Sequence, residues 1–318
     1  MTQQENHLFQ GFTIKDLRLR NRVVMPPMCM YCAGEEGIAT SWHLTHYTAR
    51  AIGGVGLIIV EATAVSPEGR ISCHDLGLWS DEHVKGLAEI VQSVHRAGGK
   101  IGIQINHAGR KCEAEGMDIE APSPLAFNEE SKIPGEMTAK DISDTVSEFQ
   151  EAARRAHLAG FDLLQIHAAH GYLISEFLSP LTNQRTDEYG GSLENRVRFL
   201  GEILDAVSEV WPETKPLDVR ISAEDYGEGG NMREDLGHML NLVKDKGIDL
   251  VNVSTGGVIP TPPKTFPGFQ VPHAEVIHEM TGLPVAAGAL ITDPAFADAV
   301  ISEGRADLVY IGRELLRN

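Results

Sequence analysis

The sequence of 318 residues is poor in cysteine, in positive charge and in long apolar runs. Its four cysteines are too few for the disulfide framework of a small secreted domain. Its 27 Lys and Arg are outnumbered by 45 Asp and Glu, and the formal net charge of -18 disfavours nucleic acid and anionic lipid as partners. The apolar run Ala51–Val60 stops at Glu61, well short of the roughly 18 residues of a membrane span. We therefore expect neither nucleic acid nor a membrane among its partners.

The amino terminus, MTQQENHLFQGF, lacks the basic start and the apolar middle of a secretory signal. Together with the few cysteines, this predicts a cytoplasmic protein. Hydrophobic residues make up 42% of the chain and charged residues 23%, which is typical of globular rather than disordered proteins.

Eight short apolar runs alternate with segments of helical periodicity along the chain. The continuous apolar character of the runs indicates strands that are buried on both faces, as in a parallel sheet. The runs are Arg22–Met28, Val55–Val65, Lys100–His107, Phe161–Ala168, Leu217–Ala223, Ile248–Thr255, Leu283–Leu290 and Ala306–Ile311. The helical segments are Trp42–Ile52, Asp81–Ala97, Thr138–Ala159, Leu193–Val210, Arg233–Lys246, Pro272–Met280 and Pro294–Glu303.

This strict alternation predicts an α/β fold, the (β/α)8 or TIM barrel, as a single domain over residues 1–318. A doubly wound open sheet is the alternative. Long loops after the third and fourth strands, Lys111–Gly135 and Gly171–Gly191, would lie at the carboxyl ends of the strands, where barrels have their active sites. The chain stops at Asn318, seven residues beyond the eighth run, so we expect a barrel with a shortened C-terminus that lacks its closing helix.

Polar residues stand where the predicted strands end, and polar groups on apolar strands need a reason. They are Cys29 and Tyr31 after the first strand, Glu61 and Thr63 on the second, Gln104 and His107 on the third, His167 and His170 at the fourth, Arg220 on the fifth, and Arg313 after the eighth. This placement predicts a catalytic rim.

The segment His167-Ala168-Ala169-His170-Gly171-Tyr172 is the strongest of these groups. Histidines three residues apart on one helical turn face the same way, so both imidazoles could donate to one substrate oxygen, and Tyr172 could supply a proton. A metal site is the alternative for this pair, but the sequence shows no clustered third ligand and no HExxH, and we expect no metal. Two core histidines with ordinary hydrogen bonds are the other alternative.

Cys29-Met30-Tyr31-Cys32 forms a CxxC motif, which in isolation suggests a redox dithiol or half a zinc site. The sequence contains no second CxxC, and Cys73 and Cys112 stand singly in loop-like sequence. We expect Cys29 to act as a polar sulfur beside a flat group, with a small buried apolar residue as the alternative.

The seventh and eighth strands end in Gly288-Ala289 and Gly312-Arg313, where barrels often bind phosphate through backbone N–H groups. Combined with Gln104 and Arg220, this pattern implies a flat, phosphorylated and hydrogen-bonding cofactor, which fits flavin mononucleotide (FMN). The chain has no GxGxxG in a βαβ unit that would indicate a Rossmann dinucleotide site.

Taken together, the motifs resemble those of the Old Yellow Enzyme family, and the pattern of Cys29 and Tyr31 is similar to its thermophilic-like class of bacterial ene-reductases. The resemblance extends from about Phe9 to Arg317. The motifs that bear it are NRVVMPPMCMY, VEATAV, IGIQINHAGRK, HAAHGYLISEFLSPLTNQRTDEYGGSLENR, DVRISAEDY and ADLVYIGRELLR. It implies an FMN enzyme that oxidises NADPH or NADH and reduces the C=C bond of enones, enals, maleimides or nitroalkenes.

The resemblance also implies roles for individual residues. His167 and His170 would bind the carbonyl or nitro oxygen of the substrate, Tyr31 would add a contact, and Tyr172 would deliver the proton. The residues expected to hold FMN are Pro26, Pro27, Met28 and Cys29 along the flavin, Ala62, Gln104 and Arg220 at its ring system, and Gly288, Gly312 and Arg313 at its phosphate.

The sequence departs from the family pattern at three places. Members of the class usually continue beyond GRELLR with a helix and a tail that completes the neighbouring subunit's pocket. The resemblance implies a homo-oligomer, either a dimer or a tetramer, and this departure weakens that expectation. Cys32 stands where serine is common, so that pairing with Cys29 is conceivable, and Asn106 precedes His107 where a small residue is frequent.

The rival interpretations are an iron-sulfur dienoyl-CoA reductase, a zinc hydrolase, and a flavin-binding module with an incomplete pocket and no turnover.

Overall fold

Within residues 6–317, which the computed structural model describes, eight parallel strands close into a barrel. Strand β3 pairs with both β13 and β4, and this double pairing closes the sheet. In sheet order the strands are β3 (Val23–Met25), β13 (Leu308–Tyr310), β12 (Val285–Ala287), β11 (Leu250–Ser254), β10 (Leu217–Ser222), β9 (Leu163–Ala168), β6 (Ile101–Asn106) and β4 (Leu57–Ala64), and a short strand β5 (Leu76–Gly77) extends the pairing of β4. The predicted TIM barrel is confirmed, and each strand lies inside its predicted run.

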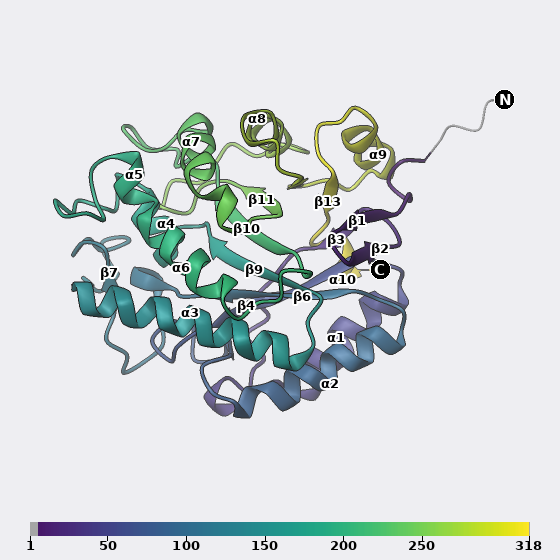
Figure 1. Cartoon of the computed structure of the whole chain (residues 1–318), viewed down its shortest axis with the longest axis horizontal. Coiled ribbons are helices and arrows are strands. Elements are labelled where there is room, and N and C mark those ends of the chain that lie inside the picture. Colours follow the sequence, from purple (N-terminus) through teal and green to yellow (C-terminus); the bar gives the residue numbers. More distant parts are fainter. Residues whose placement is uncertain (1–5, 318) are drawn as a thin grey trace.

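The helices surround the barrel, as Figure 1 shows, because each has one apolar face to bury against the strands. In α3, residues Ile142, Phe149 and Ala156 recur at the spacing of one helical face and are fully buried. Thr138 begins this helix with a capping box, in which its hydroxyl accepts from the Asp141 amide and Asp141 accepts from the Thr138 amide. The helices that follow strands are α1 (Ser41–Ile52), α2 (Glu82–Arg96), α3 (Ala139–Ala159), α6 (Arg198–Ser208), α7 (Arg233–Val243), α8 (Val271–Thr281) and α9 (Pro294–Ser302).

Two of the predicted helices are divided. The predicted helix Leu193–Val210 is interrupted at Val197, which separates α5 (Leu193–Arg196) from α6. The end of Arg233–Lys246 tightens into a 3-10 turn, η3 (Lys244–Lys246). After β13 the chain forms α10 (Glu314–Arg317), a helix of four residues. Within residues 6–317, no helix is both long and apolar enough to cross a membrane.

An amino-terminal hairpin closes the bottom of the barrel, a feature that the sequence did not indicate. Strands β1 (Phe12–Ile14) and β2 (Leu17–Leu19) pair antiparallel. Their apolar side chains pack against the first inward-facing residues of the barrel strands, which are Val24, Leu57, Leu163, Leu250 and Leu308. The amino-terminal mouth is therefore filled, and the opposite rim is left for the site.

The two long loops lie at that opposite rim and contain short elements. The first includes η2 (Gly109–Lys111) and the paired strands β7 (Glu120–Ala121) and β8 (Gly135–Glu136), and the second includes α4 (Leu173–Leu178). They pack on each other: Glu176 of α4 accepts from the Arg110 amide at 3.0 Å, and the Gln184 amide donates to Ser123 at 2.9 Å. The two loops therefore form one continuous wall beside the carboxyl ends of β6 and β9.

The hairpin supplies the first testable prediction. Leu17 is 3% exposed inside the barrel mouth, so Leu17→Ala leaves a cavity and should lower the free energy of unfolding by about 2–5 kcal/mol. Leu158, which is 57% exposed on α3, offers a matched control, and Leu158→Ala should change that free energy by no more than about 0.5 kcal/mol. Urea denaturation measures both, and equal losses in the two variants would contradict the role of the hairpin.

Candidate active site

The barrel gathers the sequence-predicted residues at the carboxyl ends of its strands, because parallel strands all end on the same side. Gln104 lies in β6, His167 in β9 and Arg220 in β10, while Ala62 lies in β4. The remaining predicted residues follow strands directly: Pro26, Pro27, Met28 and Cys29 follow β3, His170 and Tyr172 follow β9, Gly288 follows β12, and Gly312 and Arg313 follow β13.

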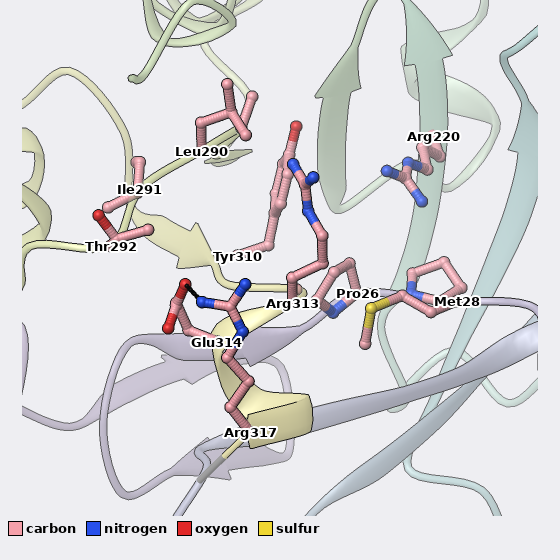
Figure 2. A pocket seen from close by; sticks show the side chains of 13 residues that line it. Pro26, Met28, Arg220, Leu290, Ile291, Thr292, Tyr310, Arg313, Glu314 and Arg317 are labelled. Carbon is pink, nitrogen blue, oxygen red and sulfur yellow. Dashed lines mark hydrogen bonds and ion pairs between the residues drawn. The ribbon is translucent and has the colours of Figure 1, made fainter. Parts of the chain in front are cut away.

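A cavity of about 440 Å³ opens at this rim between the ends of β3, β10, β12 and β13 (Figure 2). Six residues of its lining were predicted to bind the cofactor: Pro26, Pro27, Met28, Arg220, Gly312 and Arg313. The other lining residues were not among those predicted to hold the cofactor, although Ala289 belongs to the Gly288-Ala289 strand end; they are Ala289, Leu290, Ile291, Thr292, Tyr310, Glu314 and Arg317. The cavity therefore unites part of the predicted flavin wall with part of the predicted phosphate site, while Cys29, Ala62, Gln104 and Gly288 are not among its lining residues.

Arg220 is the charged group at the inner end of this cavity. Its side chain is buried, which lowers its pKa, and in the described part of the chain its Nε atom has no hydrogen-bond partner. The guanidinium lies 5.7 Å from the centroid of the Tyr310 ring. An unpartnered donor on a buried cation is costly unless a polar ligand accepts from it. This orphaned donor fits a cofactor that brings hydrogen-bond acceptors into the cavity.

The two predicted phosphate-site glycines have different surroundings. A Cβ atom on Gly288 would lie 2.3 Å from the Tyr310 ring, so Gly288 allows Tyr310 to pack flat, and it does not itself line the cavity. A Cβ atom on Gly312 would lie 3.3 Å from Met28 Sδ, which places Gly312 in the cavity wall. Arg313 and Tyr310 both line the cavity (Figure 2), and the exposed Arg313 side chain can meet an anion at its mouth.

The histidine pair lies on the adjacent strand, since His167 is the register partner of Arg220. His167 Nε2 and His170 Nδ1 face each other at 3.4 Å. The Ala169 amide donates to His167 Nδ1 at 3.3 Å, which places the His167 proton on Nε2. Burial holds the pKa of both imidazoles well below 6.5, and the charges of Arg220 and Lys111 act in the same direction.

His170 is held from three directions. Its backbone has a φ of 61°, in the left-handed region, and its amide donates to Ser222 Oγ at 2.9 Å. Its Nε2 atom lies 2.7 Å from Ser254 Oγ, and Ser254 in turn accepts from Gln270 Nε2 at 3.1 Å. The Ser254 hydroxyl can donate to His170 Nε2, and in that tautomer the ring proton of His170 lies on Nδ1. With this tautomer, both imidazole protons point into the gap between the rings.

Tyr172 packs edge-on against this pair. Its ring centroid lies 5.0 Å from that of His167, at an interplanar angle of 80°. Burial, more than any neighbouring charge, raises its pKa well above the ordinary value of 10, so the phenol keeps its proton. Lys111 Nζ lies 5.0 Å from the ring centroid and donates to the His170 carbonyl at 2.9 Å. Lys111 therefore joins the loop of His170 to the ring of Tyr172.

The segment Cys29–Cys32 lies beside Ala62 and Tyr172. Cys29 and Tyr172 both pack against the small apolar cluster of Ala62, Ile71, Ala108, Cys112 and Ala114. Burial foremost, and then the charges of Asp75 and Glu61, raise the pKa of Cys29 to about 12, which makes it a thiol rather than a nucleophilic thiolate. Both Cys29 and Cys32 are free thiols in the described structure.

Glu61 shapes the turn that presents Tyr31. Its carboxylate accepts from the Met30 amide at 2.8 Å and from the Tyr47 hydroxyl at 3.0 Å. Tyr31, with a φ of 55° and 48% of its surface exposed, stands at the edge of the rim. Burial raises the pKa of Glu61 to about 7. The polar residue predicted at the end of the second strand therefore supports the turn before it.

Sequence reasoning missed four residues that complete the site: Lys111, Ser254, Gln270 and Tyr310. Ser254 is the last residue of β11, and its place at a strand end was the available signal. Gln270 precedes α8 and Tyr310 ends β13, where its hydroxyl donates to the Val253 carbonyl at 2.8 Å. Among the described residues, no group of three or more His, Cys, Asp or Glu side chains is arranged to hold a metal ion.

Comparison with known proteins identifies the family. The model of the NADH:flavin oxidoreductase / NADH oxidase family matches residues 7–318. An NADPH dehydrogenase of Geobacillus thermodenitrificans (strain NG80-2) is 56% identical over 312 residues, covering 98% of this chain and 91% of its own. Two solved structures share the fold: the old yellow enzyme homologue from Zymomonas mobilis has a TM-score of 0.83 at 30% identity, covering 96% of this chain and 88% of its own. The 2-naphthoyl-CoA reductase structure has a TM-score of 0.92 at 26% identity over 97% of this chain, which spans half of that longer chain. The predicted resemblance is confirmed, and the chain belongs to the NADH:flavin oxidoreductase / NADH oxidase family as an FMN-dependent oxidoreductase of the Old Yellow Enzyme type.

Proposed function

We propose that this FMN-dependent NADPH oxidoreductase reduces the C=C bond of activated alkenes: enones, enals, maleimides and nitroalkenes. The observation on which this rests is the pair of neutral imidazoles whose Nε2 (His167) and Nδ1 (His170) atoms converge at 3.4 Å, beside the buried phenol of Tyr172. Two neutral donors facing one point suit a carbonyl or nitro oxygen, which gains negative charge as the neighbouring C=C bond is reduced.

The cavity at the rim is the proposed site of FMN. Gly312 and Arg313 would hold its phosphate, and Pro26, Pro27 and Met28 would line its ring. Arg220, whose Nε atom lacks a partner in the described structure, would donate to the ring system, with Gln104, Cys29 and Ala62 on its other side. Gly288 would act through Tyr310, which it allows to pack against the cavity. When bound, FMN accepts hydride from NADPH, or from NADH, and passes it to the alkene.

The protein itself contributes to the reaction by holding protons on particular nitrogen atoms of the two histidines. The backbone of Ala169 keeps the His167 proton on Nε2, and Ser254 keeps the His170 proton on Nδ1. Because both groups are fixed before the substrate binds, little reorganisation is needed when charge develops on the oxygen. Loss of one such donor typically raises the barrier by about 2.7–4 kcal/mol.

Tyr172 is the proposed proton donor. It lies next to His167 but faces a different part of the pocket wall, against the cluster around Ala62. Its raised pKa keeps the proton available at neutral pH, and the Lys111 ammonium beside the ring favours the phenolate that forms when the proton leaves. Tyr31, at the exposed edge of the rim, is the proposed further contact to substrate.

Removing both imidazoles tests the oxygen contact. The variant His167→Ala/His170→Ala should retain FMN but reduce 2-cyclohexenone or N-methylmaleimide at least about 100-fold more slowly, since at least one donor of 2.7–4 kcal/mol is lost. His238→Ala, on the exposed face of α7, is the matched control and should keep its rate. Turnover at the wild-type rate in the double variant would exclude this role. A wild-type protein that keeps FMN but is never reoxidised by the alkene would instead be a binding module.

A second variant tests the proton donor. Tyr172→Phe removes only the hydroxyl, and should slow reoxidation of the reduced cofactor by the alkene about 100-fold while leaving its reduction by NADPH within about twofold of wild type. Tyr189→Phe, whose hydroxyl donates to Glu202 of α6, serves as control. Stopped-flow absorbance separates the two half-reactions, and an equal slowing of both would count against Tyr172 as the donor.

The protonation states can be observed directly. Because burial lowers the pKa of both histidines well below 6.5, each should still be neutral at pH 6.5, where a free imidazole is half protonated. In ¹⁵N-histidine NMR, with signals assigned by their loss in the single alanine variants, His167 should carry its proton on Nε2 and His170 on Nδ1. A pKa between 6 and 7 for either ring, or the opposite tautomers, would contradict the proposed pair of neutral imidazole donors.

A further inference from the structure

Three polar side chains form a continuous ladder across the barrel interior, below the rim. Gln104 of β6 is the register partner of Gln165 of β9, and Gln165 is the register partner of Asp218 of β10. Gln104 Nε2 donates to Gln165 Oε1 at 2.7 Å, and Gln165 Nε2 donates to Asp218 Oδ2 at 2.5 Å. All three are buried, with at most 1% of their surface exposed.

The ladder lies one inward-facing position below the active-site residues. Side chains two positions apart on a strand point to the same face, so Gln165 and His167 share the inner face of β9, and Asp218 and Arg220 share that of β10. Gln104 is the one member of the ladder that belongs to the proposed cofactor site. Gln165 and Asp218 have no part in that site, and a barrel interior is normally filled with apolar branched residues. Their presence at this depth calls for a function.

The Asp218 carboxylate at the end of the ladder determines which way the hydrogen bonds of the ladder run. An ionised carboxylate can only accept hydrogen bonds, whereas an amide donates from one side and accepts on the other. Asp218 therefore turns the Gln165 NH2 group toward itself and the Gln165 carbonyl toward Gln104. That carbonyl in turn draws the Gln104 NH2 group, which leaves Oε1 of Gln104 as the outward atom. In the described part of the chain, Oε1 receives no hydrogen bond.

Asp218 is a carboxylate in mildly alkaline solution. Burial raises its pKa to about 7, while the hydrogen bond from Gln165 and the charge of Arg220 act against that rise. Its second oxygen, Oδ1, is buried with no partner among the described residues. The carboxyl group can therefore accept a further hydrogen bond and is not required to donate one. At pH 8 the ionised Asp218 therefore fixes which groups of the ladder donate and which accept.

We propose that Asp218 and Gln165 are positioning residues that hold the Gln104 amide with its carbonyl oxygen toward the cofactor, so that Gln104 accepts from the flavin ring. The oxidised isoalloxazine ring has one N–H group, at N3. An acceptor at Gln104 therefore selects that edge of the ring and sets the orientation in which FMN binds. The inference rests on the proposed FMN site and deepens it, because it names the two residues, Gln165 and Asp218, that orient Gln104 in that site.

The test compares two cofactors at pH 8. FMN and 3-methyl-FMN, in which a methyl group replaces the N3 proton, are each titrated into the flavin-free full-length protein, and the ratio of their Kd values is measured by flavin fluorescence. Wild type should prefer FMN by at least about tenfold, as expected for a contact of about 1.4 kcal/mol. Asp218→Leu should reduce this ratio at least threefold, and Gln104→Leu should reduce it as far. A merely structural role of Asp218 would lower both affinities alike and leave the ratio unchanged.

A second variant covers the case in which Asp218→Leu does not fold. Gln165→Met/Asp218→Leu removes both buried polar groups together, so it leaves neither a lone carboxylate nor an unpaired Gln165, and such paired replacements are often close to neutral for stability. It should also show the reduced ratio. Asn252→Leu, which removes a neighbouring buried side-chain amide but keeps the backbone hydrogen bond from Asn252 to Asp218, is the control and should keep the wild-type ratio.

The outcomes separate the two proposals. If the protein binds FMN and the ratio stays at its wild-type value in Asp218→Leu, or in the double variant, the positioning role is overturned while the FMN site stands. If Gln104→Leu alone leaves the ratio unchanged, the ring edge does not face Gln104 and the inference is also overturned. If the wild-type chain binds neither cofactor, the proposed site itself fails. A ratio reduced in all three ladder variants and kept in Asn252→Leu supports the inference.

Discussion

The constraint on which this structure depends is that polar side chains inside a closed parallel barrel must find partners there. Water cannot satisfy a group such as Asp218 or His167, and an unpaired buried group costs about 1–3 kcal/mol or more. The barrel interior supplies these partners: a backbone amide for His167 and a hydroxyl for His170 at the rim, and the Gln165 amide for Asp218 below it. Each partner fixes the direction of a proton, and the same contacts that permit burial thereby prepare the site for its ligands.

Burial also sets the electrostatics of the rim. It keeps the imidazoles of His167 and His170 neutral, the phenol of Tyr172 protonated and the thiol of Cys29 un-ionised, and it does so for each group more strongly than any single neighbouring charge. The charged groups that line the cavity are Arg220 at the inner end, Arg313 at the mouth and the Arg317–Glu314 ion pair, so the net charge of the lining is positive. A site of neutral donors with cations at its two ends suits a phosphorylated cofactor and a polarised, uncharged substrate.

The sequence alone predicted the barrel and the strand ends, because strands that are buried on two faces leave continuous apolar runs between the helical segments. It predicted the family through the motifs that resemble those of the Old Yellow Enzyme family. It could not predict the amino-terminal hairpin, since strands of three residues such as Leu17–Leu19 leave almost no periodicity. Its prediction of Gly288 at the phosphate stays a prediction, and it did not foresee that a side chain at Gly288 would collide with the Tyr310 ring. It also passed over Gln165 and Asp218, because their significance arises from the register of three strands, which only the folded sheet defines.

The most direct test of the account is a single anaerobic experiment on the wild-type protein. The FMN-loaded protein is reduced with one equivalent of NADPH and mixed with N-methylmaleimide in a stopped-flow instrument, and the flavin absorbance is followed. The account predicts that the absorbance of the oxidised cofactor returns fully, at a rate that rises with alkene concentration and then saturates, and that one equivalent of N-methylsuccinimide forms. A cofactor that stays bound and reduced in the presence of excess alkene would contradict it.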